Sequence, residues 1–192
     1  MFGRTVLGLA VLMGLVGCAP TSGHIIAVSG STVGVGSKAP DIEYVSINGR
    51  RASFNRVRLP VTIVAFTPTE ANSCSWLDPN VVNLSNEFWD LPVTVAQFSL
   101  PTDTCPHGQA CVEVSNLHKG GLMSLCDAQR LAWKAYGQPA PDSLILIGAN
   151  GKIIMMGSLS NPQPIVKEAQ RLGGAEKQRL INQEQDTNAD ID

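Results

Sequence analysis

Apolar runs separated by turn-forming residues predict several strands along the chain. Residues 61–66 are apolar or β-branched without alternation, which is typical of a central strand covered on both faces. Residues 93–100, "VTVAQFSL", and residues 122–125, "LMSL", predict two further strands. The segment "SLILIGANGKIIMMG" predicts two strands joined by a turn at Asn150-Gly151. Strands therefore recur from the middle of the chain to residue 157.

An earlier hairpin and three helices complete this pattern. The segment "IEYVSINGRRASF" predicts two short strands around Asn48-Gly49. Asp78 and Pro79 are typical of the N-cap and the first residue of a helix. Asp127 is typical of the cap of a second helix, which ends before Gly137. Residues 164–172 predict a last helix. Strands alternating with helices predict a mixed α/β sheet.

Two segments carry no such periodicity. Residues 101–121 predict a long loop, and loops of that length in a compact domain are often functional. From Gly173 onward the chain is polar, and we expect a tail at residues 174–192 that frays.

The N-terminus has the pattern of a secretion signal. Arg4 precedes an apolar run of residues 5–16, which is short for a permanent membrane span. The last four residues of "MFGRTVLGLAVLMGLVGC" resemble a bacterial lipobox, which implies cleavage after residue 17 and lipidation of Cys18. The alternative is an ordinary signal peptide with an incidental cysteine. The resemblance implies an exported chain, lipid-anchored to the bacterial cell envelope on its periplasmic face.

The remainder of the chain divides into a tether and one domain. Residues 18–38 are rich in Gly and Ser and predict a flexible tether, within which "HIIAVSGSTVGVG" allows a loose edge strand. Residues 39–173 suffice for one domain with a real core. The formal charge of −2, without a cluster of Lys or Arg, indicates no nucleic-acid partner.

The order of elements resembles the thioredoxin fold. "VGSKAPDIEYVSINGRRASF" resembles the segment that leads into redoxins and peroxiredoxins of the alkyl hydroperoxide reductase and thiol-specific antioxidant type. "LCDAQRLAWKAYG" followed by "LILIGANGKI" resembles the second half of that superfamily. The likeness covers residues 35–172. It implies a thioredoxin-like α/β fold, with a central mixed sheet flanked by helices and an N-terminal hairpin.

Cys74 is the candidate nucleophile. It follows a predicted central strand and precedes a helix, whose N-terminus would stabilise a thiolate. The resemblance implies thiol-dependent reduction of a peroxide or a disulfide, with Thr69, Ser73 and Trp76 beside the substrate. The alternatives are a structural role for Cys74 and a role for Trp76 as a core anchor.

The chain departs from its relatives at several positions. Leu77 excludes a C-x-x-C motif, and Asp78 excludes the C-x-x-x-C motif of copper chaperones. Thr67 and Ala71 stand where peroxiredoxins have Pro and Thr or Ser, and "QPAPDS" lacks their Arg. These departures favour the second hypothesis, a non-catalytic thioredoxin-fold lipoprotein that binds a partner or a metal in the manner of a copper chaperone.

A second cysteine would resolve a sulfenate on Cys74. The resemblance implies Cys111 for this role, with Cys105 as the other candidate. A structural Cys105–Cys111 disulfide is the alternative. Cys105, His107, Cys111 and His118 do not have a standard zinc spacing, so we expect no metal and no cofactor. Cys126 follows an apolar strand and is predicted to be a small core residue.

Thioredoxin-like proteins place a cis-proline opposite the reactive cysteine, where it offers a backbone edge to substrate. The resemblance implies this role for Pro141, with Pro139 as the second candidate. It also implies an external thiol reductant, a thioredoxin-like protein, as the partner that restores the thiols.

Overall fold

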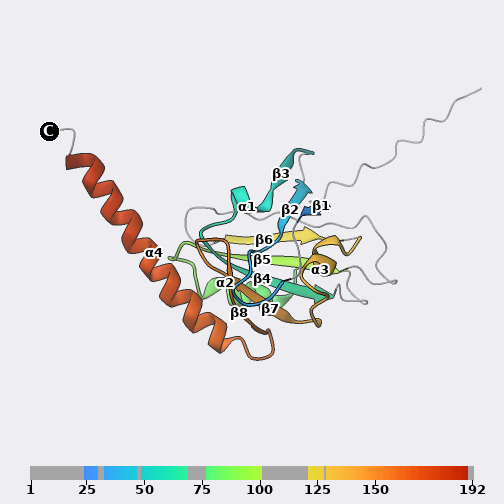
Figure 1. The fold of residues 1–192 in the computed structure, drawn as a ribbon. Helices are drawn as coiled ribbons and strands as arrows, with labels where there is room; N and C mark the ends of the chain where they lie inside the picture. The colour runs from blue at the N-terminus through green and yellow to red at the C-terminus, as the bar shows by residue number, and fades with distance from the viewer. Residues whose placement is uncertain are drawn as a thin grey trace, which may run out of the picture.

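The computed structural model describes residues 24–29, 33–46, 49–68, 77–100, 121–127 and 129–189, without the side chains of residues 24 and 187–189. These residues form one sheet whose strand order is β3-β2-β1-β6-β5-β4-β7-β8 (Figure 1). The strands are β1 His24–Ser29, β2 Asp41–Val45, β3 Arg51–Ser53, β4 Val61–Pro68, β5 Val93–Leu100, β6 Gly121–Cys126, β7 Ser143–Ile147 and β8 Ile153–Ser158. The helices are α1 Phe54–Val57, α2 Pro79–Asn86, α3 Leu131–Ala135 and α4 Gln163–Ala189. The predicted mixed α/β sheet is confirmed.

Strand β4 lies in the interior of this sheet, between β5 and β7. It pairs in parallel with β5 along its whole length, from Val61–Val93 to Pro68–Leu100, and antiparallel with β7. Strand β6 continues the parallel set on the far side of β5. The first seven residues of β4 are buried, so the prediction that this strand is covered on both faces is confirmed.

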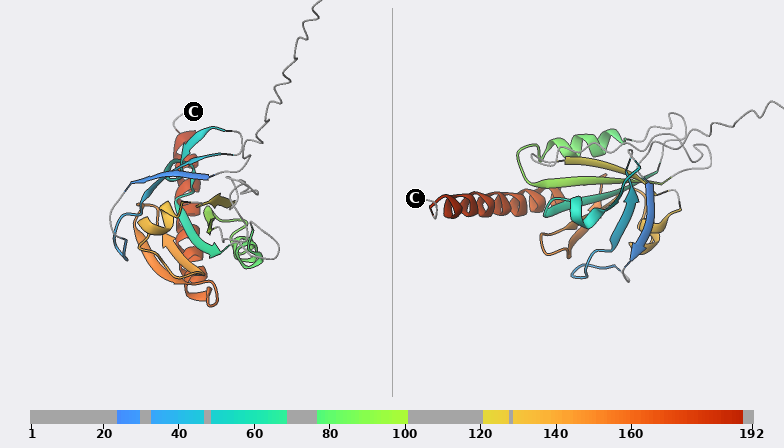
Figure 2. Two further views of the ribbon diagram at one scale, coloured as in Figure 1. Left: turned by 90° about the vertical axis from the view of Figure 1, so that its right-hand side faces the viewer. Right: turned by 90° about the horizontal axis from the view of Figure 1, so that it is seen from above.

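Different helices cover the two faces of the sheet (Figure 2). Helices α1 and α3 contribute Phe54 and Ala132 to a core that includes Phe66 and Phe98, and Tyr136, directly after α3, joins the same core. The rings of this core meet edge to face, with Phe66 and Phe98 centroids 5.3 Å apart. The second face is covered by α2 and α4, whose core residues are Val81, Leu84, Ile165, Val166 and Ala169.

Local sequence signals place most element ends. Asp78 is the N-cap of α2, and its carboxylate accepts a hydrogen bond from the Asn80 N–H at 2.8 Å, as predicted. The β2–β3 and β7–β8 hairpins are also confirmed. Gly49 and Gly151 have φ of 78° and 75° in these hairpins, a conformation that glycine adopts without steric penalty.

The N-terminal part corrects two expectations. Strand β1 is not an edge strand, because it lies between β2 and β6 and buries Ile25. Residues 24–29 therefore belong to the sheet, although they fall within the predicted tether. The second strand of the first hairpin ends at Ser53, and Phe54 begins the short helix α1 with its ring buried in the core.

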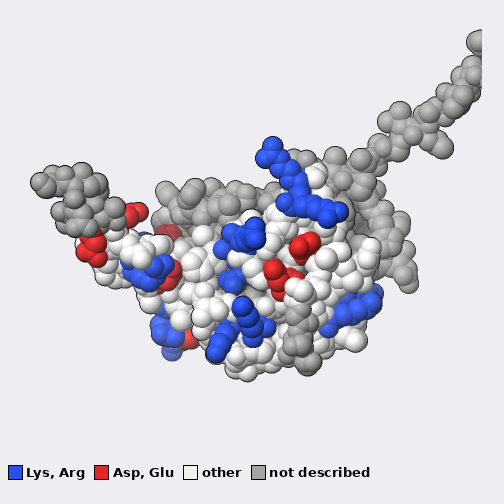
Figure 3. Space-filling model, turned by 45° about the horizontal axis from the view of Figure 1, so that its top comes forward, with Lys and Arg blue, Asp and Glu red and all other residues white. Residues whose placement is uncertain are grey.

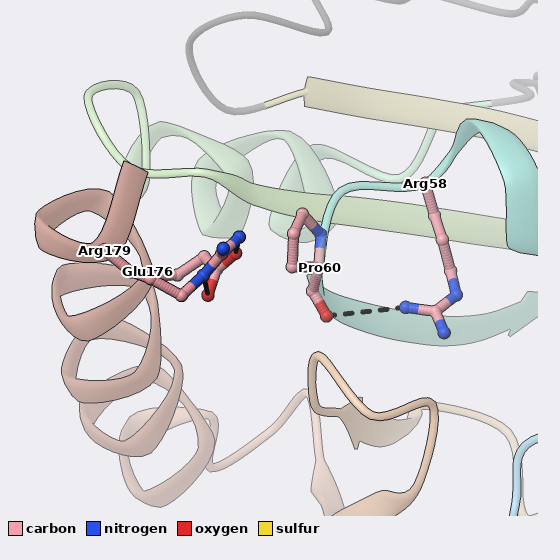
Figure 4. Close-up of polar contacts among 4 residues, drawn as sticks. All are labelled: Arg58, Pro60, Glu176 and Arg179. Carbon is pink, nitrogen blue, oxygen red and sulfur yellow. Dashed lines mark hydrogen bonds and ion pairs between the residues drawn. The ribbon is translucent and has the colours of Figure 1, made fainter. Parts of the chain in front are cut away.

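Helix α4 corrects a third expectation, since it runs to Ala189 instead of ending near residue 172. Figures 1 and 2 show its C-terminal half extending away from the sheet. The predicted tail is rich in strong helix formers, and Glu176 pairs with Arg179 one turn later (Figure 4). Lys177 also lies 3.4 Å from the Asp90 carboxylate. Among the described residues, no helix is both long enough and apolar enough to cross a membrane.

Two adjacent glycines show how α4 meets the sheet. A Cβ atom at Gly173 would lie 2.8 Å from Val93 Cγ2, whereas a Cβ at Gly174 would have nothing within 4 Å. Val93 is fully buried and cannot move aside. The helix therefore passes the sheet at Gly173 more closely than any other residue type allows.

We expect Gly173→Ala and Gly174→Ala to change stability in opposite directions. The first forces α4 away from Val93 and should lower the free energy of unfolding by about 1–3 kcal/mol. The second adds a helix-favouring methyl group in open space and should raise it by up to about 1 kcal/mol. Urea unfolding of both variants measures this, and equal gains at the two positions would contradict the close packing.

Candidate functional site

Buried polar side chains gather where three parallel strands end. Thr67, Ser99 and Cys126 are register partners across β4, β5 and β6. Two residues earlier, Gln97 of β5 pairs with Ser124 of β6. Side chains alternate along a strand, so all five lie on the face that α2 and α4 cover. Cys126 is half-buried and the other four are buried. We call these five residues the polar row.

Gln97 connects the polar row to the start of α2. Its side-chain carbonyl accepts a hydrogen bond from the Asp78 N–H at 3.0 Å, and its amide group donates to Ser99 Oγ at 2.9 Å. Only 2% of Gln97 is exposed. Because Asp78 is the N-cap of α2, this side chain fixes where the helix begins relative to β5.

The hydroxyl of Thr67 is the exception in this row. It is fully buried and has no hydrogen-bond partner among the described residues. An unsatisfied buried hydroxyl costs about 1–3 kcal/mol, and such groups call for an explanation such as a bound water or a catalytic role. Thr67 stands directly before Pro68, the last residue of the strand that leads into residues 69–76. The unused donor therefore lies on the α2 side at the end of β4.

Asp127 connects the same edge to α3. Its N–H donates to the Ser99 carbonyl at 3.0 Å. Its carboxylate accepts from the N–H groups of Leu131 at 2.7 Å, Ala132 at 3.2 Å and Trp133 at 2.7 Å. Burial raises the pKa of the Asp127 carboxyl, and these three donors oppose that rise. The side chain of Asp127 thus caps α3, as predicted, although the N-cap position itself is Arg130, whose backbone is left-handed with a φ of 54°.

A second buried polar group lies on the opposite face of the sheet. Tyr136 has no hydrogen-bond partner for its hydroxyl among the described residues, and burial raises its pKa well above the ordinary value, an effect that Arg58 opposes. Burial in turn lowers the pKa of Arg58. Arg58 donates to the carbonyls of Leu59 at 3.4 Å and Pro60 at 3.5 Å, just before β4 (Figure 4). Arg58 thus contacts the segment before β4, at the edge opposite the polar row, whereas the ring of Tyr136 packs on Phe66 with the ring centroids 5.5 Å apart.

A shallow hollow of about 520 Å³ lies on the surface of the β2–β3 hairpin and α1. Asp41, Glu43, Arg51 and Arg56 line it. Figure 3 shows Lys and Arg side chains on this side of the molecule, with acidic side chains among them. The hollow shares no residue with the polar row.

Most of the predicted site residues lie outside the described part of the chain. These are the lipidation candidate Cys18, the nucleophile Cys74 with Thr69, Ser73 and Trp76, the two resolving candidates Cys105 and Cys111, and both loop histidines. Within the described residues, no group of three or more His, Cys, Asp or Glu side chains is arranged to hold a metal ion.

Pro141 is described, and it corrects the expectation of a cis-proline. The peptide bonds of the described residues are all trans, including those before Pro139 and Pro141. Between α3 and β7 the chain reverses its direction with left-handed backbone at Gly137, Gln138 and Asp142, whose φ values are 76°, 58° and 67°. The Asp142 N–H then donates to the Phe66 carbonyl at 2.9 Å, which continues the pairing between β7 and β4.

The sequence contains a signal for the polar row that lies outside the cysteine motifs. Gln97 and Ser99 stand two positions apart in an otherwise apolar strand, so they share one face of it. Polar residues on a face predicted to be buried need internal partners. That spacing identifies a buried network, although its partners at Asp78 and Asp127 follow only from the fold.

Comparisons with known proteins support the fold. The chain matches no protein-family model and no curated protein sequence. A thiol:disulfide interchange protein from Bacteroides sp. is 16% identical, with a TM-score of 0.50 over 74% of this chain and 91% of that one. Mycobacterium bovis AhpC is 12% identical, with a TM-score of 0.49 over 74% and 94%. A 2-Cys peroxiredoxin from Plasmodium vivax is 17% identical, with a TM-score of 0.47 over 74% and 83%.

The chain has the thioredoxin-like fold. This conclusion rests on the similarity at a TM-score of 0.50 and on the mixed sheet flanked by helices. Identities this low describe the architecture and leave the reaction to be argued from the residues.

We expect replacement of Gln97 by Met to loosen the start of α2. Met has a similar volume but leaves the Asp78 N–H without its acceptor, which should lower the free energy of unfolding by about 1–3 kcal/mol. Gln170→Met, at an exposed position of α4, is the matched control and should change it by less than about 0.5 kcal/mol. Hydrogen exchange adds a local test, because the Asp78 amide should lose protection only in the Gln97 variant. Unchanged protection there would contradict the anchoring role.

Proposed function

We propose that this thioredoxin-like domain is a membrane-tethered, thiol-dependent oxidoreductase that reduces a peroxide or a disulfide through Cys74. The observation that carries the proposal is the polar row, and in particular the Thr67 hydroxyl at the end of β4, which has no partner within the described part of the chain. A hydroxyl in that place is a ready donor for a charged or polar group on the segment that follows the strand. Cys74 lies in that segment.

The start of α2 supports the same assignment. Cys74 precedes the N-cap Asp78 by four residues, and the partial positive charge of a helix N-terminus lowers the pKa of a nearby thiol. Gln97 fixes this terminus to the sheet. A rigid helix start and a rigid strand end thus bound the segment that carries the proposed nucleophile.

The chemistry follows from a thiolate at Cys74. With a peroxide, the sulfur attacks one oxygen, the O–O bond breaks, and the other oxygen leaves as an alcohol or water after taking a proton. The thiol of Cys111, or of Cys105, then attacks the sulfenate, releases water and forms a disulfide. With a disulfide substrate, Cys74 attacks one sulfur and the other leaves as a thiolate. An external dithiol, such as a thioredoxin-like protein, supplies two electrons and two protons to restore the thiols.

The tethering part of the proposal rests on the N-terminal pattern. A signal segment at residues 1–17 and a lipid on Cys18 would place the domain in the cell envelope, where thiol chemistry of this kind has substrates. The chain lacks the C-x-x-C motif of ordinary dithiol exchangers. In the proposed chemistry, the second thiol is supplied instead by Cys105 or Cys111, in the segment at residues 101–120.

The first experiment tests Cys74 directly. The full-length protein is reduced, given one equivalent of hydrogen peroxide or of oxidised glutathione, and mapped by peptide mass spectrometry beside Cys74→Ser. We expect rapid loss of the Cys74 thiol, ending in a bond to Cys111 or Cys105, and no such bond in the variant. An inert Cys74 with Cys105 and Cys111 already bridged would overturn the proposal and leave a binding module.

Thr67→Val separates catalysis from stability. The variant removes a buried hydroxyl that has no partner among the described residues, so the free energy of unfolding should stay the same or rise by up to about 1 kcal/mol. Loss of a hydrogen bond to the thiolate should slow oxidation of Cys74 by about tenfold, which corresponds to about 1.4 kcal/mol. Thr67→Ser keeps the hydroxyl and should keep the rate. Equal rates for Val and Thr would remove Thr67 from the site.

A further inference from the structure

We infer that the C-terminal half of α4 pairs with the same segment of a second copy of this chain, with the two helices antiparallel. Among the described residues of α4, the buried side chains end at Glu176. From Lys177 to Asp186 every side chain is exposed, and Figures 1 and 2 show this part extending away from the sheet. The inference concerns assembly and does not depend on the proposed thiol chemistry.

The exposed part of α4 has an apolar pair at its centre. Leu180 and Ile181 are each 39% exposed and are surrounded in sequence by polar residues. Lys177 stands three residues before Leu180, and Glu184 stands three residues after Ile181. Positions i, i+3, i+4 and i+7 lie on one side of a helix, so these four residues form one face. We call this the pairing face.

The pairing face is complementary to itself when the two helices run antiparallel. In a twofold arrangement centred between Leu180 and Ile181, each Leu180 lies opposite Ile181 of the second copy, and each Lys177 lies opposite Glu184. Two pairs of opposite charge then flank the apolar contacts. In a parallel arrangement, each Lys177 and each Glu184 would instead lie opposite its own copy, and like charges in contact are unfavourable.

The charges along the rest of α4 favour the same arrangement. Residues 163–179 contain four cations and two acids, whereas residues 180–189 contain two acids and no cation. An antiparallel pair therefore places the acidic half of each helix against the more basic half of the other. Lys177 also contacts Asp90 at 3.4 Å, but 47% of its side chain stays exposed, so it can contact Glu184 of the second copy as well.

The turn after α2 adds an exposed aromatic side chain beside the pairing face. Asp90 contacts Lys177, and a Cβ atom at Gly173 would lie 3.4 Å from Leu91 Cβ, so this turn follows α4 between these two residues. Trp89 in the same turn is 68% exposed. In the antiparallel pair, the helix of the second copy runs past this stretch of α4 beyond its own Glu184. Tryptophan is enriched at protein interfaces, and Trp89 is placed to contact that helix.

Sedimentation velocity of the full-length protein in a density-matched detergent measures the association. We expect a weak monomer–dimer equilibrium, because two short helical segments bury less than the roughly 1,600 Å² of a standard interface. Leu180→Gln should raise the dissociation constant at least about tenfold, since it removes an apolar contact from both halves of the interface. Met156→Gln, at a position of β8 that is 42% exposed, is the matched control and should leave the dissociation constant unchanged.

A charge exchange tests the antiparallel register. Lys177→Glu and Glu184→Lys should each raise the dissociation constant about tenfold, because each places like charges opposite one another twice. The double variant should restore the association. Asp90→Asn removes only the contact of Lys177 within its own chain and should have no effect on the association.

Three results would overturn the inference. The first is a protein that stays monomeric at concentrations up to about 1 mM. The second is a dimer that Leu180→Gln leaves intact, which would place the contact elsewhere on the chain. The third is weakening by Lys177→Glu without recovery in the double variant, which would exclude the antiparallel register.

Discussion

The burial of β4 on both faces is the constraint on which the rest of this molecule depends. A strand in that position needs neighbours on both sides for its backbone and apolar layers above and below for its side chains. Strands β5 and β7 provide the hydrogen-bonding neighbours. Helices α1 and α3 provide the apolar layer on one face, and α2 and α4 provide it on the other. Because every segment is fitted to β4, the positions at its end are determined with the precision of the core. Those positions lead into the segment that contains Cys74.

The same burial explains why the polar row is organised as a network. Gln97 and Ser99 lie in a strand that is buried along its full length, where a polar group without a hydrogen-bond partner would lower the free energy of unfolding. Gln97 meets this requirement through Asp78, and the Ser99 backbone meets it through Asp127. Each aspartate then caps a helix, one on either face of the sheet. The end of β5 therefore positions the starts of both α2 and α3.

Local signals in the sequence predicted much of this fold, because the interactions behind them are local. The apolar runs of β4 and β5, the caps Asp78 and Asp127, and the glycine hairpins depend on neighbours within a few residues. The interior place of β1 depends instead on pairing with β2 and β6, and its glycine-rich surroundings conceal that pairing. The length of α4 was missed because Gly173 reads as a helix end, yet here it permits close contact with Val93. Pro139 and Pro141 are both trans, and the chain turns at left-handed residues near them instead. No local sequence pattern predicts this conformation.

The departures from the peroxiredoxin pattern gain a physical meaning once the hydrogen-bond donors at the start of α2 are considered. The Asn80 N–H at the start of α2 already binds the Asp78 carboxylate, and the Asp78 N–H binds Gln97. A thiolate on the preceding segment thus has fewer helix donors than a bare helix terminus offers, and the Asp78 carboxylate opposes its charge. Residues 138–143, which lead into β7, contain no Arg to compensate. In the proposed chemistry the hydroxyl of Thr67 takes over part of that role, as a neutral donor held in a dry environment where a hydrogen bond to an anion is strong. A neutral donor favours the thiolate less than an arginine does, so the proposed arrangement suits a slow thiol reaction better than rapid scavenging of dilute peroxide.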